Sequence, residues 1–159
     1  MKKLYLYLDL AALKPLALGG RGIEHEQSEA LAVILLMLHE GKAALLSSFA
    51  LRAELRKYKN RGARAAQIKL LRGAAYSLLK ATADVAQHAA KLRAAGFGHL
   101  DALHIACAAA LDADALLTLD GGLLELARQN ATLCAVECAT PSDFVLEKKY
   151  ASKGKGKGA

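Results

Sequence analysis

The chain has few aromatic residues and few of the residues that cross-link or bend a backbone. Its 159 residues include no tryptophan, three phenylalanines, two prolines and three cysteines. Because the cysteines are odd in number and form no C-x-x-C pair, the sequence indicates neither a disulfide framework nor a thiolate metal site. We expect small, buried, reduced thiols at Cys107, Cys134 and Cys138, as is typical of cytoplasmic proteins.

Long apolar runs are also missing. The hydrophobic fraction is 54%, but charged residues divide it into short runs. No stretch reaches the roughly 20 apolar residues of a membrane span, so none is expected. The N-terminal MKKLYLYLDL has two lysines before an apolar run, yet it meets Asp9 early and lacks a small-residue cleavage site. We therefore expect a first strand there rather than a signal peptide, and a cytoplasmic protein.

The length of the chain suits one domain with its own core. We expect this domain to span residues 1–147. Residues 148–159 end in ASKGKGKGA, where glycine alternates with lysine, so they predict a basic, disordered tail. The formal net charge of +7 makes an acidic partner, nucleic acid above all, a reasonable expectation.

Short apolar strands alternate with helical patterns along the chain. Strands are predicted over KLYLYLD (residues 3–9), KAALLSS (42–48), ADALLTLD (113–120) and ATLCAVECAT (131–140). A polar loop is expected after the first strand. Helices are predicted over residues 24–40, 49–58, 100–113 and 121–130, and two more between 61 and 95. This alternation predicts an α/β fold, a three-layer α/β/α sandwich around a mainly parallel sheet of four to five strands.

Four acidic residues stand at places where such a sheet gathers functional groups. Asp9 and Asp120 end the first and third strands, Glu54 lies two turns into the helix after the second strand, and Asp101 opens an apolar helix. The carboxyl ends of parallel strands share one edge, so we expect these acids to converge. Converging carboxylates raise one another's pKa unless a cation compensates them. Mg²⁺ or Mn²⁺ suits such oxygen ligands and can direct a water at a phosphodiester, which predicts metal-assisted hydrolysis of nucleic acid.

Two of these acids have a structural interpretation at least as good as the functional one. Asp101 is a favoured helix N-cap residue. Glu54 stands between Arg52 and Arg56 and would by itself be taken for a surface residue. Asp9 and Asp120 are harder to explain in this way, because each adjoins an apolar strand.

Three further side chains near the acids need an interpretation. His104 follows Asp101 by one turn and could touch the site, but so apolar a helix favours a hydrogen-bonded core histidine. Asp112 and Asp114 lie between a predicted helix and a predicted strand, so both are expected to be solvated turn residues.

The acidic positions carry a family resemblance. The segments that carry it are YLD (residues 7–9), SSFALRAEL (47–55), DALHIACAAALDADALLTLD (101–120) and ATPSDF (139–144). In this order they resemble the PIN domain family, small nucleases that include the toxins of toxin–antitoxin modules. The most specific part runs from residue 98 to 124. The resemblance implies an α/β/α fold, Mg²⁺- or Mn²⁺-dependent cleavage of RNA, frequent homodimers and, for a toxin, an antitoxin protein as partner.

The resemblance also assigns roles to residues. It implies that the catalytic acids are Asp9, Glu54, Asp101 and Asp120, of which Asp9, Asp101 and Asp120 would bind the metal ion. Thr118 matches a hydroxyl residue that the family has just before its last acid. Ser48, at the end of the second predicted strand, is expected to support the site.

The chain departs from the family pattern at three positions. Leu10 and Ala11 follow the first acid, where the family commonly has a threonine or serine and then a small polar residue. Gly121 follows the last acid, where a second acid is frequent. The alternative to a ribonuclease is therefore a catalytically degenerate PIN-fold module that binds RNA or another protein. A phosphohydrolase acting on metabolites is disfavoured, since no D-x-D follows the first strand and no Gly-rich loop opens a helix.

Basic residues dominate the segment from residue 52 to 72, where Glu54 is the only acid. Such a run is usually a solvated helix face, but beside an acidic site it suits a phosphate-backbone track. The candidate RNA-backbone contacts are Arg52, Arg56, Lys59, Arg61 and Arg64. Tyr58 and Tyr76 are the only nearby aromatic residues, so sequence-specific reading of bases is not indicated.

Overall fold

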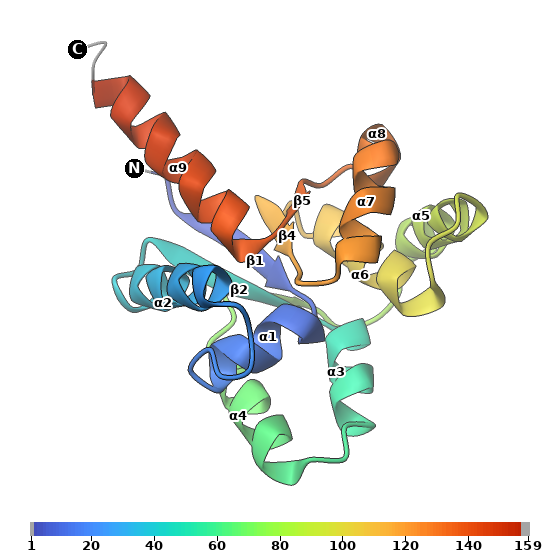
Figure 1. Cartoon of the computed structure of the whole chain (residues 1–159). Coiled ribbons are helices and arrows are strands. Elements are labelled where there is room, and N and C mark those ends of the chain that lie inside the picture. Colours follow the sequence, from blue (N-terminus) through green and yellow to red (C-terminus); the bar gives the residue numbers. More distant parts are fainter. Residues whose placement is uncertain (1, 157–159) are drawn as a thin grey trace.

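A computed structural model describes residues 2–156 of the chain, and the surroundings of the side chains of residues 2–148. Its centre is one five-stranded, all-parallel sheet (Figure 1), which confirms the predicted fold class. β1 (Leu4–Leu8) lies in the middle, between β2 (Ala43–Ser48) and β4 (Ala115–Leu117). β3 (Tyr76–Leu78) and β5 (Cys138–Ala139) form the two edges.

Helices cover both faces of this sheet. One face carries α1 (Leu10–Ala17), α2 (His25–His39) and the beginning of α9 (Pro141–Gly156). The other carries α3 (Phe49–Arg56), α5 (Ala83–Ala94), α6 (His99–Ala110), α7 (Gly121–Gln129) and α8 (Ala131–Cys134). α4 (Arg61–Leu71) packs on α1 and α3 at one end of the molecule. Within the described residues, no helix combines the length and apolar character needed to cross a bilayer.

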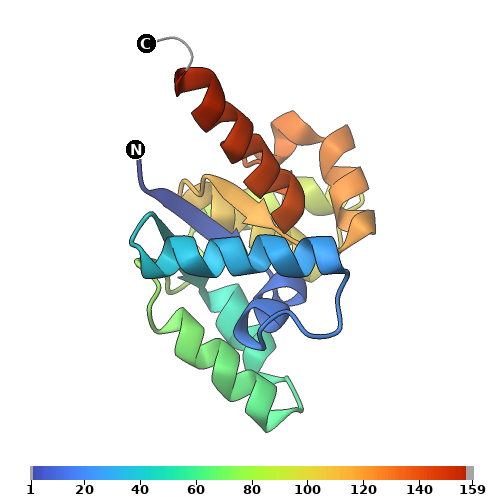
Figure 2. The same cartoon turned by 60° about the vertical axis from the view of Figure 1, so that its left-hand side comes forward.

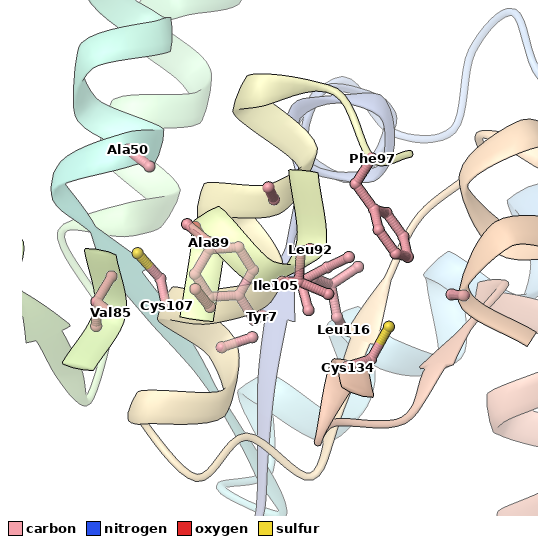
Figure 3. Packing of buried hydrophobic residues seen from close by; sticks show 14 of the residues in the cluster. Tyr7, Ala50, Val85, Ala89, Leu92, Phe97, Ile105, Cys107, Leu116 and Cys134 are labelled. Carbon is pink, nitrogen blue, oxygen red and sulfur yellow. The ribbon is translucent and has the colours of Figure 1, made fainter. Parts of the chain in front are cut away.

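The hydrophobic core is divided by the sheet into two clusters. Side chains alternate along β1, so Leu6 and Leu8 pack with α1 and α2, whereas Tyr7 points to the opposite side. Figure 3 shows Tyr7 among Leu92, Ile105 and the other apolar side chains of that second cluster. A tyrosine buried there must find polar partners for its hydroxyl group, and these lie at the candidate site.

Four of the predicted helices form close to their expected bounds, and the segment between residues 61 and 95 holds two helices as expected. Gly41 follows α2 with a φ of 73°, a left-handed conformation that suits glycine after a helix C-terminus. Four elements were not predicted: α1, β3 and, as described below, α8 and α9. α1 forms where a loop was expected, because Asp9 caps it and its apolar residues bury against the sheet. β3 adds an edge strand between α4 and α5.

The predicted fourth strand over residues 131–140 is wrong for most of its length. Its first four residues form the short helix α8, which ends at Ala135 in a left-handed conformation with a φ of 59°. Only Cys138 and Ala139 pair with β4. The apolar run resembles a strand in composition. Its hydrophobic pattern does not show that its first four residues pack on α5 and α6 as a helical turn.

The C-terminal helix crosses the predicted domain boundary. α9 begins at Pro141 against the core and projects away from the body of the protein (Figure 2). It extends past residue 147 without a break, to Gly156. The division at residue 147 stays a prediction, and residues 157–159 of the predicted tail lie outside the described residues.

Candidate active site

Asp9 lies at the carboxyl end of the central strand. The register of β1 and β4 sets Leu8 opposite Leu117, which brings the next residues, Asp9 and Thr118, together. The Thr118 hydroxyl donates to Asp9 Oδ2 at 2.6 Å, and the backbone N–H of Ala12 donates to Asp9 Oδ1 at 3.2 Å. Asp9 is therefore both the N-cap of α1 and a buried acid, only 7% exposed. Thr118 supplies polar support that Leu10 and Ala11 do not.

Asp120 is joined to Asp9 through the same threonine. Its backbone N–H donates to Thr118 Oγ1 at 3.1 Å. Its Oδ1 accepts from the N–H of Leu123 at 3.1 Å, so Asp120 caps α7. The side chain is exposed, in contrast to the buried Asp9.

Asp101 is not an N-cap. α6 begins at His99 with Gly98 as its N-cap, and no side chain caps this helix. Asp101 stands in the first turn, half-buried, where the helix dipole favours a carboxylate. The structure therefore removes the capping interpretation from Asp101 and gives the capping role to Asp9 and Asp120.

Glu54 is held by a buried chain of hydrogen bonds. Its Oε2 lies 2.7 Å from His104 Nε2, and His104 Nδ1 lies 2.7 Å from the Tyr7 hydroxyl. The Tyr7 hydroxyl is also 2.7 Å from Ser48 Oγ, which accepts from the backbone N–H of Leu51 as the N-cap of α3. His104 is 3% exposed, so it is the hydrogen-bonded core histidine that the sequence favours, and it also touches the site through Glu54.

The partners fix the direction of one of these hydrogen bonds. The Glu54 carboxylate can only accept, so His104 Nε2 carries a proton. If Nδ1 carries no proton, it accepts from the Tyr7 hydroxyl group, and Ser48 donates to Tyr7. If Nδ1 is also protonated, it donates to Tyr7, and Tyr7 donates to Ser48. Tyr7 was not singled out in the sequence, although its place on the strand face opposite Leu6 and Leu8 is a signal that a buried hydroxyl points toward α6.

A Tyr7→Phe variant is expected to lower the free energy of unfolding by about 1 to 3 kcal/mol, because Ser48 and His104 Nδ1 lose a buried partner. Tyr5→Phe is a matched control, since the Tyr5 hydroxyl makes no hydrogen bond within the described residues. The control should stay within about 0.5 kcal/mol of the wild type. Urea denaturation followed by circular dichroism measures both, and equal stabilities of the two variants would contradict the role assigned to Tyr7.

The carboxylates influence one another electrostatically. Burial raises the pKa of Asp9 to about 6, and the negative charge of Asp101 contributes to this shift against the hydrogen bond from Thr118. Burial also raises the pKa of Asp101, and the charges of Asp120 and Glu54 add to the increase. The charges of Asp120 and Glu54 therefore reach Asp101, and the charge of Asp101 reaches Asp9.

These oxygen donors fit a hard divalent cation in their chemistry. No three acidic, histidine or cysteine side chains among the described residues are spaced to enclose a metal ion. Mg²⁺ keeps several of its waters and commonly takes only one or two carboxylates directly, so it does not need such a cage. Burial is the main cause of the raised pKa of Asp9 and of Asp101, and neighbouring carboxylates add to it. A bound cation would favour the ionised form of both acids and offset these effects.

The predicted basic residues lie on α3, on α4 and in the connection between these helices. Arg52 and Arg56 flank Glu54 on α3, Lys59 lies in the turn that follows, and Arg61 and Arg64 begin α4. Asp112 is an exposed turn residue with a φ of 53°, as expected.

Asp114 differs from the expectation of a solvated turn residue. Its Oδ2 accepts from the backbone N–H of Tyr5 at 2.7 Å, and its side chain is only 23% exposed. Asp114 thus anchors the start of β1 to the turn before β4.

The fold and the site together define a small, all-parallel α/β protein with an acidic site at the carboxyl edge of its sheet. The chain matches the PIN domain family over residues 22–129 and belongs to this family, which confirms the predicted membership. PIN domains are nucleases, often toxin components, and generally bind divalent metals. No curated protein matches the chain. The matched residues include Glu54, Asp101 and Asp120 but not Asp9, whose place in the site rests on its contacts.

Proposed function

We propose that the protein is a divalent-metal-dependent ribonuclease that hydrolyses RNA phosphodiesters at the acidic edge of the sheet. Asp9, Asp101 and Asp120 would hold the ion, one or two of them directly and the others through its bound waters. The observation that carries the proposal is that Thr118 joins Asp9 to Asp120 through two hydrogen bonds, while Asp101 lies within electrostatic reach of Asp9, Asp120 and Glu54. When bound, Mg²⁺ or Mn²⁺ supplies an activated water and offsets the charge on the phosphoryl oxygens.

The protein's own residues divide the remaining tasks. His104 binds Glu54 Oε2, which leaves Oε1 to accept a proton from the attacking water. The buried Tyr7 hydroxyl and the N-cap Ser48 hold His104 in place. Arg52 and Arg56, on the same helix as Glu54, would bind the phosphate backbone of the substrate.

The proposal also includes a toxin role, an antitoxin partner, a homodimer and a cytoplasmic location. These four parts rest on family membership alone. A small DNA-binding protein encoded beside this chain would support the toxin role. The departures at Leu10, Ala11 and Gly121 are what favours the second candidate, a non-catalytic RNA-binding module. At Gly121 no atom lies within 4 Å of where a Cβ would stand, so nothing in the fold excludes an acid there.

The two candidates are separated by one experiment. The purified protein is incubated with a mixed RNA pool in Mn²⁺, in Mg²⁺ and in chelator, and both cleavage and binding are measured. The ribonuclease predicts cleavage in either metal and none in chelator. RNA binding that persists without cleavage under every condition would assign the chain to the binding module.

A Thr118→Val variant is expected to lower metal-dependent cleavage by about 10- to 100-fold, the usual effect of removing a group that orients a metal ligand. Valine keeps the shape of the fully buried side chain but gives Asp9 no donor. The metal concentration needed for half-maximal cleavage should rise. Thr118→Ser restores the hydroxyl group and should rescue cleavage, and a Thr118→Ser variant as impaired as Thr118→Val would contradict this role.

A further inference from the structure

A groove between α3 and α4 is the second chemically distinctive site in the molecule. It has a volume of about 410 Å³, within the range of small-molecule sites. The two helices that form it lie together at the lower end of the molecule in Figure 1. Its lining residues are Ser47, Arg52, Leu55, Arg56, Arg64, Ile68, Leu71 and Arg72.

The rim of this groove carries positive charge that nothing nearby neutralises. Its four arginines take part in no salt bridge among the residues that the structure describes. Glu54 is the only acid between residues 52 and 72, and it binds His104 instead. Arg64 is held in position by the backbone carbonyl of Tyr58, to which Nη1 donates at 3.4 Å. Four guanidinium groups around one hollow predict a ligand with more than one negative charge.

The floor of the groove is apolar. Leu55 is 2% exposed and Leu71 is half-buried, whereas Ile68 is 37% exposed among the arginines. An isoleucine open to solvent between guanidinium groups is not explained by packing of the core. A phosphate track alone needs only the cations, whereas an apolar hollow inside a cationic rim suits a ligand that combines a flat ring with anionic groups.

The groove shares α3 with the candidate active site but lies on the other flank of that helix. Arg52 and Arg56 are each two residues from Glu54, so they project from nearly the opposite side of α3. Ser47, which lines the groove, points to the face of β2 opposite to that of Ser48, whose hydroxyl is hydrogen-bonded to Tyr7. An RNA strand that reaches both places must pass around α3.

We propose that this groove holds one nucleotide of the RNA substrate. Its base is not stacked on the neighbouring bases and instead contacts Leu55, Ile68 and Leu71. The phosphates on either side contact the arginines. The choice of RNA as the ligand rests on the proposed function. A base can enter the groove only where the RNA is unpaired, so the groove selects an unpaired nucleotide.

Binding without cleavage tests this groove. An Asp101→Asn protein in chelator is titrated with a fluorescent six-adenosine RNA and with an all-abasic strand of equal charge, and anisotropy is measured. The adenosine strand should bind about tenfold more tightly, because its base removes part of the apolar surface of Ile68 and Leu71 from water. Adding Ile68→Ser should reduce this preference to about threefold or less, whereas Ile68→Leu should keep it. Adding Arg72→Gln should weaken both strands equally and reduce the salt dependence by about one counterion.

Arg93→Gln is the matched control, since Arg93 is an exposed arginine on α5, away from the groove. It should leave both affinities within about twofold of the parent protein. A tenfold base preference that survives Ile68→Ser, or an Arg72→Gln protein that binds like Arg93→Gln, would overturn the proposal. A polyglutamate peptide that binds as tightly as the adenosine strand and displaces it would assign the groove to an acidic protein instead. Because no cleavage is measured, base-dependent binding by a protein that never cleaves RNA would refute only the proposed function.

Discussion

An Asp101→Asn variant is expected to cleave RNA at least about 100-fold more slowly than the wild type, the scale on which loss of one charged group at a reacting phosphate acts. Asparagine keeps the size of the side chain and removes the charge that would bind the ion. Asp101 caps no helix, and its pKa is raised by burial and by Asp120 and Glu54, so the fold should not depend on its charge. Initial rates of cleavage in saturating Mn²⁺, with unfolding curves of both proteins, measure the two effects separately.

The matched control is Asp112→Asn, in the turn that follows the same helix. Asp112 is exposed and has a φ of 53°, a conformation that asparagine adopts well. This variant should cleave RNA at the wild-type rate. An Asp101→Asn protein that retains cleavage while folding normally would remove Asp101 from the site. Parallel loss in both variants would show that the effect belongs to the helix rather than to the carboxylate.

Capping and the acidic site compete for the same residue types, and this limited what the sequence could assign. Asp101 could be interpreted as an N-cap as readily as a site residue, because both roles place an aspartate at the start of a helix. The structure shows Asp9 and Asp120 as caps instead. A cap needs one carboxylate oxygen, so Asp120 can cap α7 with Oδ1 and still face the site with Oδ2. Sequence alone could not rank these roles, because the exact start of α6 decides them.

The positions of the strand ends could be predicted from the sequence. The chain of hydrogen bonds that links Ser48, Tyr7, His104 and Glu54 could not. A period of two residues located β1, and a short apolar run between two helical segments located β2. The parallel order of the sheet then places the ends of both strands at one edge, where Asp9 lies. The partners Tyr7, Ser48 and His104 come from β1, β2 and α6, and their contacts span 41 to 97 residues of sequence. No local pattern specifies such contacts, since they depend on how the helix crosses the sheet. The same long-range packing explains why α1 and β5 were misjudged from composition.

An Asp9→Asn variant is expected to be more stable than the wild type at pH 7.5 without metal, although it should lose cleavage. The pKa of Asp9 is raised from 3.8 to about 6, so the folded state favours the neutral acid. The stability that the neutral form provides is complete below pH 3.8 and is lost as the pH rises through about 6. About two pKa units correspond to about 3 kcal/mol at most. The weakened hydrogen bond to Thr118 should reduce the gain by about 1 kcal/mol.

Urea denaturation in chelator at pH 7.5 and at pH 4 tests whether Asp9→Asn raises the free energy of unfolding. The stability advantage of Asp9→Asn should be present at pH 7.5 and shrink toward zero at pH 4, because the wild-type carboxyl group is then protonated in the folded state. Adding Mn²⁺ at pH 7.5 should stabilise the wild type more than the variant, since the variant keeps only Asp101 and Asp120 of the three proposed ligands. A variant less stable than the wild type at pH 7.5 without metal would show that Asp9 serves the fold as a cap more than it serves a cation site. An equal gain from metal in both proteins would place the ion elsewhere. We therefore expect the ionised Asp9 carboxylate to lower the stability of the metal-free protein, and a bound cation to offset this loss.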